Sequence, residues 1–70
     1  MTSEAERSIR VARALVKARH VLEDEDAGAR WLLAPSKALG GKRPLSLLGS
    51  GDGFAAVMDE LGRIDHGVFS

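Results

Sequence analysis

Leu39-Gly40-Gly41-Lys42-Arg43-Pro44-Leu45-Ser46-Leu47-Leu48 is the stretch that decides how this 70-residue chain folds. Its two adjacent glycines supply backbone angles that other residues rarely adopt, and its proline suits the first position of a helix. The stretch therefore predicts a tight corner that leads directly into a short helix from Pro44 to Leu48, with its leucines turned to the interior. One helical block precedes this corner, and another follows it.

The block before the corner begins with a long predicted helix from about Glu4 to Leu22. These residues are rich in good helix formers and include neither Gly nor Pro. Ser3 and Glu6 have the spacing of a capping box, in which the two side chains satisfy free backbone N–H groups at a helix start.

The apolar residues of this first helix fall into two rows instead of one. The first row contains Ala5, Ile9, Ala12 and Val16, and the second row contains Val11, Leu15, Ala18 and Leu22. A surface helix needs only one apolar stripe. The additional row therefore predicts contact with a second surface, either within this domain or on another chain.

A short second helix is predicted to follow the acidic run and to end at about Ala34. Asp24 is placed to cap its start, and Pro35 ends it because the residue before a proline avoids helical angles. Spacings of four and three residues put Ala27, Trp31 and Ala34 on one face. Trp31 is therefore expected to anchor the core.

The last helix is predicted from about Asp52 to His66, with Ser50 or Asp52 as its cap and Gly67 as a glycine cap beyond its end. Its periodicity is the clearest in the chain. One face carries the apolar residues Phe54, Val57, Met58, Leu61 and Ile64.

A chain of this length forms one domain at most, here predicted to be all-α with about four helices. Residues 1–22 contain the long helix, and residues 23–70 form a compact part with two short helices and an amphipathic last helix. The residues expected to form the core and the corner are Trp31, Gly40, Gly41, Pro44, Leu45, Leu48, Phe54, Val57, Leu61 and Ile64. Such a domain buries only about 60% of its unfolded surface. Because the chain has no cysteine, oligomerisation or a partner protein is the expected support.

Composition argues against several classes of protein. Ten Lys and Arg balance ten Asp and Glu, so the chain lacks the positive charge that drives autonomous nucleic-acid binding. The N-terminus has neither the basic start nor the apolar run of a secretory signal, and no apolar stretch reaches membrane-spanning length. We therefore expect a cytoplasmic chain with no membrane association.

The sequence contains no complete motif for catalysis or metal binding. Gly41-Lys42 lacks the first glycine and the following Ser or Thr of a phosphate-binding loop. His20 and His66 stand on different helices without a second ligand at helical spacing. The acidic run from Asp24 lacks the glutamate that ends a calcium loop. We therefore predict no catalytic residue, no metal and no cofactor, and hence a protein that is not an enzyme.

Three segments taken together resemble a known family. They are Ala27-x-x-x-Trp31-Leu32-x-x-Pro35, Ala38-Leu39-Gly40-Gly41-x-x-Pro44-Leu45-x-Leu47-Leu48 and Gly53-x-x-x-Val57-x-x-x-Leu61-x-x-Ile64-x-His66-Gly67-Val68. In order and spacing they are similar to the toxin-binding domain of MbcA/ParS/Xre-type bacterial antitoxins, from about Arg10 to Ser70. Arg43 departs from the family, which often has Thr there. Only the first helix precedes the similar region, which leaves no room for the separate helix-turn-helix domain of many members.

The resemblance implies an antitoxin of a type II toxin–antitoxin system. Members of the family neutralise a companion toxin with a RES domain, an enzyme group that attacks NAD or uses it to ADP-ribosylate a target. The C-terminal part of the domain packs over the active-site entrance of the toxin. On this basis the expected toxin-binding residues are Arg63, His66, Gly67, Val68, Phe69 and Ser70.

The same C-terminal residues have a simpler interpretation. Val68 and Phe69 would fold back on the core, Gly67 would be only a helix cap, and Arg63 would pair with Asp59 one turn earlier. Another class of function also stays open, because the broad apolar sector of the first helix suits a dimerisation or adaptor module. Such a module would serve a DNA-binding or signalling partner without inhibiting an enzyme.

Overall fold

The computed structural model describes residues 3–67, within which three α-helices form: α1 (Glu4–Leu22), α2 (Glu25–Leu33) and α3 (Gly51–Gly67). Two 3-10 helices, η1 (Lys37–Leu39) and η2 (Pro44–Leu47), connect α2 to α3. The predicted all-α class is confirmed. The predicted short third helix is present as η2 in the tighter 3-10 form, whereas nothing in the sequence indicated η1.

Each α-helix begins at a side-chain oxygen that accepts a hydrogen bond from the backbone. The acceptors are the Oγ of Ser3, the carboxylate of Asp24 and the Oγ of Ser50, and the N–H three residues later donates to each at 3.1, 3.1 and 3.0 Å. Such a cap satisfies one of the unpaired N–H groups at a helix start and contributes about 1 kcal/mol. The predicted caps at Ser3 and Asp24 are confirmed, and of the two candidates for α3 it is Ser50 that caps the helix.

Helix α2 folds back against α1 through a tight turn. Glu23 takes a left-handed conformation at the end of α1, with φ of 55°. Helix α2 then approaches so closely that a Cβ on Gly28 would lie 2.9 Å from the backbone nitrogen of Arg19. Because that neighbour is backbone, it has no rotamer by which to move away. Gly28 therefore permits the packing of α2 on α1, a role that its place in the sequence did not reveal.

The glycine corner has the predicted form. Gly40 and Gly41 have φ angles of 71° and 80°, in the left-handed region that favours glycine. The backbone N–H of Ser36 donates to the carbonyl of Lys42 at 3.0 Å, and the N–H of Gly41 donates to the carbonyl of Ser36 at 2.8 Å. These bonds close the loop at its base. The chain then enters η2 at Pro44, which is buried.

The core lies where the α-helices and η2 meet. Its buried apolar residues are Ala14, Ala18, Val21, Leu32, Leu48, Val57 and Leu61. Partly buried residues pack around them, namely Val11, Leu15, Leu22, Trp31, Leu39, Leu45, Leu47, Phe54, Met58 and Ile64. The predicted apolar face of α3 is thus confirmed.

One prediction about the core was wrong in detail. Trp31 is partly buried and packs against the core, but the buried residue that anchors α2 is the next one, Leu32, which is 4% exposed. Helix α2 packs against both α1 and η2. The side of α2 that faces the core is therefore centred on Leu32, one residue after Trp31. On α1 the buried face consists of Ala14, Ala18 and Val21, because the small side chains allow the other elements to approach closely.

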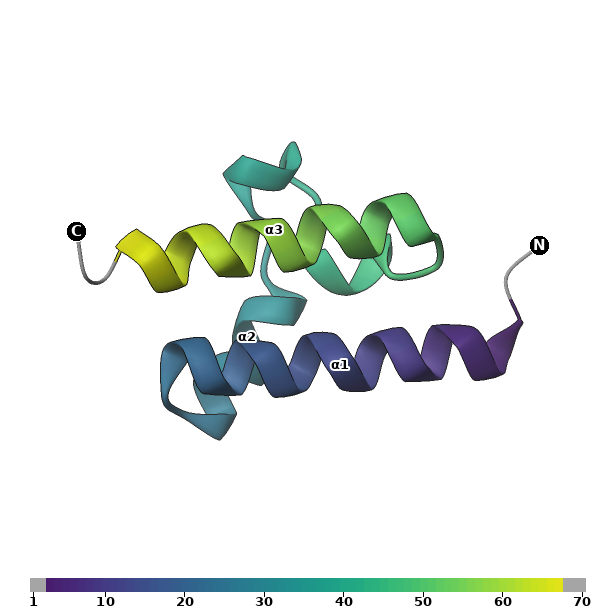
Figure 1. The fold of residues 1–70 in the computed structure, drawn as a ribbon. Coiled ribbons are helices and arrows are strands. Elements are labelled where there is room, and N and C mark those ends of the chain that lie inside the picture. The colour runs from purple at the N-terminus through teal and green to yellow at the C-terminus, as the bar shows by residue number, and fades with distance from the viewer. Residues whose placement is uncertain (1–2, 68–70) are drawn as a thin grey trace.

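Helices α1 and α3 run side by side in the same direction (Figure 1). The first apolar row of α1 is not covered by this arrangement, since Ile9 is 55% exposed and Val16 is 65% exposed. Within residues 3–67, therefore, the domain does not provide the second surface that this row predicts.

Helix α3 begins in very close contact with η2. A Cβ on Gly53 would overlap the carbonyl oxygen of Leu47 and lie 2.8 Å from its carbonyl carbon. Only glycine fits this position without a shift of the backbone. In contrast, a Cβ on Gly62 of the same helix would meet open space. The contact between Gly53 and Leu47 thus sets where α3 starts and the direction in which it leaves the corner.

We expect Gly53→Ala to destabilise the domain by about 1–3 kcal/mol, because the new methyl group must displace backbone atoms. The matched control is Gly62→Ala, which should raise the free energy of unfolding by about 0.5–1 kcal/mol because alanine is the better helix former. Urea unfolding followed by circular dichroism measures both. Equal effects of the two substitutions would show that α3 does not depend on the contact with η2.

Candidate functional site

The C-terminal end of α3 carries the described part of the predicted binding site. Arg63, His66 and Gly67 are all exposed there. Gly67 is the last helical residue, and its φ is not in the left-handed region, so it is not the glycine cap that was predicted beyond the helix end. The other predicted residues, Val68, Phe69 and Ser70, lie outside the described residues, so what was predicted of them stays a prediction.

Arg63 is held along α3 by two carboxylates. Its Nε lies 3.2 Å from Oε1 of Glu60, and its Nη2 lies 3.7 Å from Oδ2 of Asp59. The Glu60 side chain is 11% exposed, whereas that of Arg63 is 63% exposed. The predicted pairing of Arg63 with Asp59 is therefore confirmed. Since exposed ion pairs contribute about 0–1 kcal/mol, the pair with Asp59 orients the guanidinium more than it stabilises the fold, whereas the pair with Glu60 gives a nearly buried carboxylate its cation.

The end of α3 is presented from a firmly anchored helix. Val57 and Leu61 on its inner side are fully buried in the core. The last-turn carbonyls of any α-helix carry partial negative charge, and the half-buried Asp65 adds a carboxylate to this part of α3. The outer side therefore combines an exposed guanidinium at Arg63 with acceptor groups close to the helix end.

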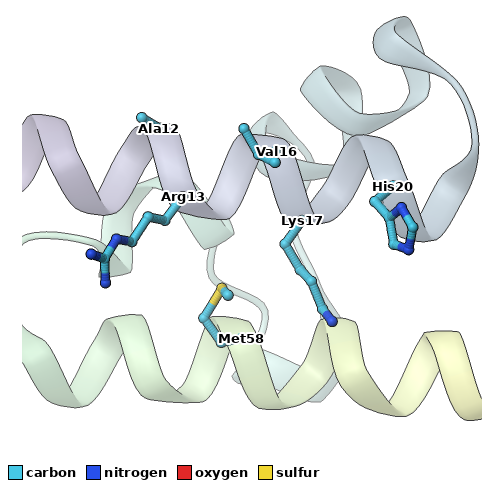
Figure 2. A pocket seen from close by; sticks show the side chains of 6 residues that line it. All are labelled: Ala12, Arg13, Val16, Lys17, His20 and Met58. Atoms are coloured by element: carbon cyan, nitrogen blue, oxygen red, sulfur yellow. The ribbon is translucent and has the colours of Figure 1, made fainter.

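A groove of ≈ 510 Å³ lies between α1 and α3, at a place that the sequence did not predict as a site. Its lining residues are Ala12, Arg13, Val16, Lys17, His20 and Met58. Figure 2 shows Arg13 and Lys17 reaching from α1 toward α3, and Met58 reaching from α3 toward α1. A second hollow of ≈ 240 Å³ shares Arg13 with the groove and is lined by Glu6, Ile9, Arg10, Arg13 and Phe54.

The groove suits contact with another protein better than chemistry on a small molecule. Its apolar floor and cationic rim match apolar side chains that are flanked by carboxylates. The sequence signal for the groove was the first apolar row of α1, which supplies Ala12 and Val16. Met58, the lining residue from α3, was predicted only as part of the core face of that helix. Within residues 3–67, no three His, Asp or Glu side chains gather where they could hold a metal ion. In the same range, no helix has both the length and the apolar character needed to cross a bilayer.

Residues 17–67 match the family described as the antitoxin Xre/MbcA/ParS C-terminal toxin-binding domain. The chain belongs to this family. The match begins in the last two turns of α1 and ends with α3. The toxin-binding domain thus includes the glycine corner, η2 and the exposed end of α3, and it confirms the family resemblance that the three sequence segments indicated.

Two proteins named Antitoxin Xre are similar to the chain over almost its whole length. The one from Photorhabdus laumondii subsp. laumondii is 36% identical over 70 residues, which cover 94% of this chain and 47% of that protein. The one from Yersinia enterocolitica is 38% identical over 68 residues, which cover 96% of this chain and 46% of that protein. The chain therefore spans about half the length of the curated relatives that it matches.

Many of the residues that carry the family resemblance support the toxin-binding domain from inside. Gly40 and Gly41 turn the corner, Gly53 lies against η2, and Val57 and Leu61 fill the core. The resemblance therefore identifies the scaffold directly.

We expect Arg63→Ala to lower the free energy of unfolding by about 1–2 kcal/mol, because its pair with Asp59 is solvated but the nearly buried Glu60 loses its cation. Leu61→Ala should cost about 2–5 kcal/mol, because it opens a cavity in the core. Thermal unfolding of the two variants beside the parent chain measures this difference. A large loss of stability in Arg63→Ala would mean that this residue holds the fold and is unsuitable for tests of binding.

Proposed function

We propose that this chain neutralises a RES-domain toxin, an enzyme that consumes NAD or uses it to ADP-ribosylate a target, by covering the toxin's active-site entrance with the C-terminal end of α3. The observation that carries the proposal is the match of residues 17–67 to a toxin-binding domain. The name Antitoxin Xre of its relatives supports the same role. In this proposal the chain inhibits a catalyst and is not one itself, and it needs no cofactor.

Occlusion requires a rigid exposed element, and α3 supplies one. Its inner side is anchored by Val57 and Leu61, so little conformational freedom remains to be lost when the outer side is bound. Arg63 is already oriented by Asp59 and Glu60. It therefore enters the interface with much of its side-chain entropy already removed.

Electrostatics also favours the end of α3 as the blocking element. An enzyme that binds NAD must hold a diphosphate, which requires hydrogen-bond donors and positive potential. The C-terminal end of a helix presents partial negative charge from its carbonyls, and Asp65 lies in the same turns. We therefore propose that this end occupies the region where the toxin holds the phosphates, while Arg63 and His66 contact the rim.

The proposal places the chain in the cytoplasm, where the NAD pool of a bacterium lies. Binding to DNA by residues 3–67 alone is not part of it, because the formal charges of the chain balance. The alternative function is an adaptor that inhibits no enzyme. The exposed first row of α1, with Ile9 and Val16, suits the contact with another protein that such an adaptor makes.

The test is co-expression with a RES-domain toxin, taken from the neighbouring gene if that gene encodes one, together with a pull-down. We expect Arg63→Glu combined with His66→Ala to weaken toxin binding by about tenfold or more, which corresponds to about 1.4 kcal/mol, and to restore toxicity. The matched control is Arg30→Glu, since Arg30 is an exposed arginine on α2 that also pairs with a carboxylate, at 4.0 Å from Asp24.

A chain that ends at Gly67 tests the part of the site that lies outside the described residues. If this truncated chain loses neutralisation while α3 stays folded by circular dichroism, Val68 to Ser70 belong to the blocking element. If it still neutralises the toxin, the contact lies on α3 itself. Full toxicity in the presence of the unaltered chain would sink the antitoxin proposal and leave the adaptor alternative.

A further inference from the structure

We propose that the groove between α1 and α3 is a docking site for an acidic amphipathic helix of a second, different protein. The groove of ≈ 510 Å³ and the hollow of ≈ 240 Å³ meet at Arg13, which lines both. We call the two together the extended groove. Its lining residues on α1 run from Glu6 to His20, a length of about 20 Å, which matches a docked helix of about four turns.

The floor of the extended groove is apolar. Ala12, Val16 and Met58 supply it in the larger part, and Ile9 and Phe54 supply it in the smaller part. Val16 is 65% exposed and Ile9 is 55% exposed. A partner that covers these side chains removes them from water, which is the dominant favourable term in most protein association.

Three basic side chains form a row along this floor. Arg13, Lys17 and His20 follow one another at spacings of four and three residues, so they share a face of α1. Figure 2 shows Arg13 and Lys17 on either side of Met58, both directed toward α3. For none of the three does a carboxylate of residues 3–67 lie within ion-pair distance. The row therefore attracts carboxylates that a partner brings.

The other end of the extended groove carries a compensated charge. There Glu6 lies 3.7 Å from Arg10 within α1. The attraction for carboxylates is thus concentrated between Arg13 and His20. We therefore place the acidic residues of the partner helix on the flank that meets this half of the groove.

The walls of the groove favour a helical partner over an extended one. Both walls are α-helices, whose backbone N–H and C=O groups are bonded within each helix. An extended peptide finds no sheet edge here with which to form main-chain hydrogen bonds. A helix satisfies its own backbone groups and presents one apolar stripe to the floor.

Two other occupants fit the groove less well. A nucleic acid is charged along its whole length, so it would place phosphates against Val16 and Met58. A second copy of this chain carries exposed carboxylates from Glu23 to Asp26, but no exposed apolar side chain lies among them. An acidic amphipathic helix of a different protein offers carboxylates and an apolar stripe on one face.

The groove and the proposed toxin contact lie on different sides of α3. Met58 precedes Arg63 by five residues, which places the two side chains about 140° apart around the helix. Both surfaces are therefore open to occupation at the same time. The docking site goes beyond the proposed antitoxin function, and failure of either proposal leaves the other untouched.

Binding of a synthetic peptide to the full chain tests the chemistry of the site. The probe is a fluorescent helix of about four turns, with leucines at spacings of three and four residues and glutamates along one flank. A comparison peptide has lysines in place of the glutamates. We expect fluorescence anisotropy to show binding of the glutamate peptide about tenfold or more tighter than that of the lysine peptide. Equal affinities, or no binding at several hundred micromolar, would overturn the proposal.

Two matched substitutions on α1 locate the site. Arg7 and Arg13 are both exposed, but only Arg13 lines the groove. We expect Arg13→Glu to weaken binding of the glutamate peptide by about tenfold, and Arg7→Glu to weaken it by less than about twofold. Circular dichroism should show unchanged helix content for both, since both positions are solvated. Equal losses of affinity would reveal general charge attraction without a site.

The methyl group of Met58 reports whether the floor is covered. Met1 and Met58 are the two methionines of the chain, so isotope labelling of methionine methyl groups gives one NMR signal from the groove, assigned by its loss in Met58→Leu. We expect this signal to shift with the glutamate peptide and to stay unchanged with a single-stranded oligonucleotide. A shift with the oligonucleotide but not the peptide would assign the groove to nucleic acid. A shift on concentrating the chain alone, with none on adding the peptide, would assign it to a second copy, and either result would overturn the proposal.

Discussion

The contact between Gly53 and the carbonyl of Leu47 is the constraint on which the rest of this domain depends. Because no side chain fits between them, α3 must start directly on η2, and its direction is set at its first turn. The glycine corner before η2 determines where η2 lies, through the left-handed angles of Gly40 and Gly41. Helix α3 then carries Val57 and Leu61 into the core, and its far end is held where a partner can reach it. A backbone contact at one end of α3 thus positions the proposed binding surface at the other.

The two opposite sides of helix α1 have different surroundings, one the core of the domain and the other solvent. Its inner side uses small residues, Ala14 and Ala18, which let the rest of the domain approach closely. Its outer side leaves Ile9 and Val16 in water, which contributes nothing to the stability of a single copy. A small domain with a marginal core gains stability from any partner that binds only its folded state. The exposed row is therefore best understood as a surface for association, separate from the end of α3.

In the proposed function, scaffold and recognition are divided among different residues. The segments that carry the family resemblance contain the glycines and apolar residues that turn the corner and fill the core, so they describe how the domain is built. Arg63, which is oriented by Glu60 and Asp59, lies among these residues along α3 but on its exposed side.

The sequence by itself determined the all-α class, the three capped α-helices, the glycine corner and the apolar face of α3. These features follow from local rules of propensity, capping and periodicity, which act over a few residues. Only the tertiary structure decided that Leu32 and not Trp31 anchors α2, that Gly28 and Gly53 are needed for close approach, and that the first row of α1 stays exposed. Each of these depends on how far apart and at what angle two elements lie. That distance and angle depend on the side-chain volumes of both packed elements, and the sequence of one element alone does not contain them.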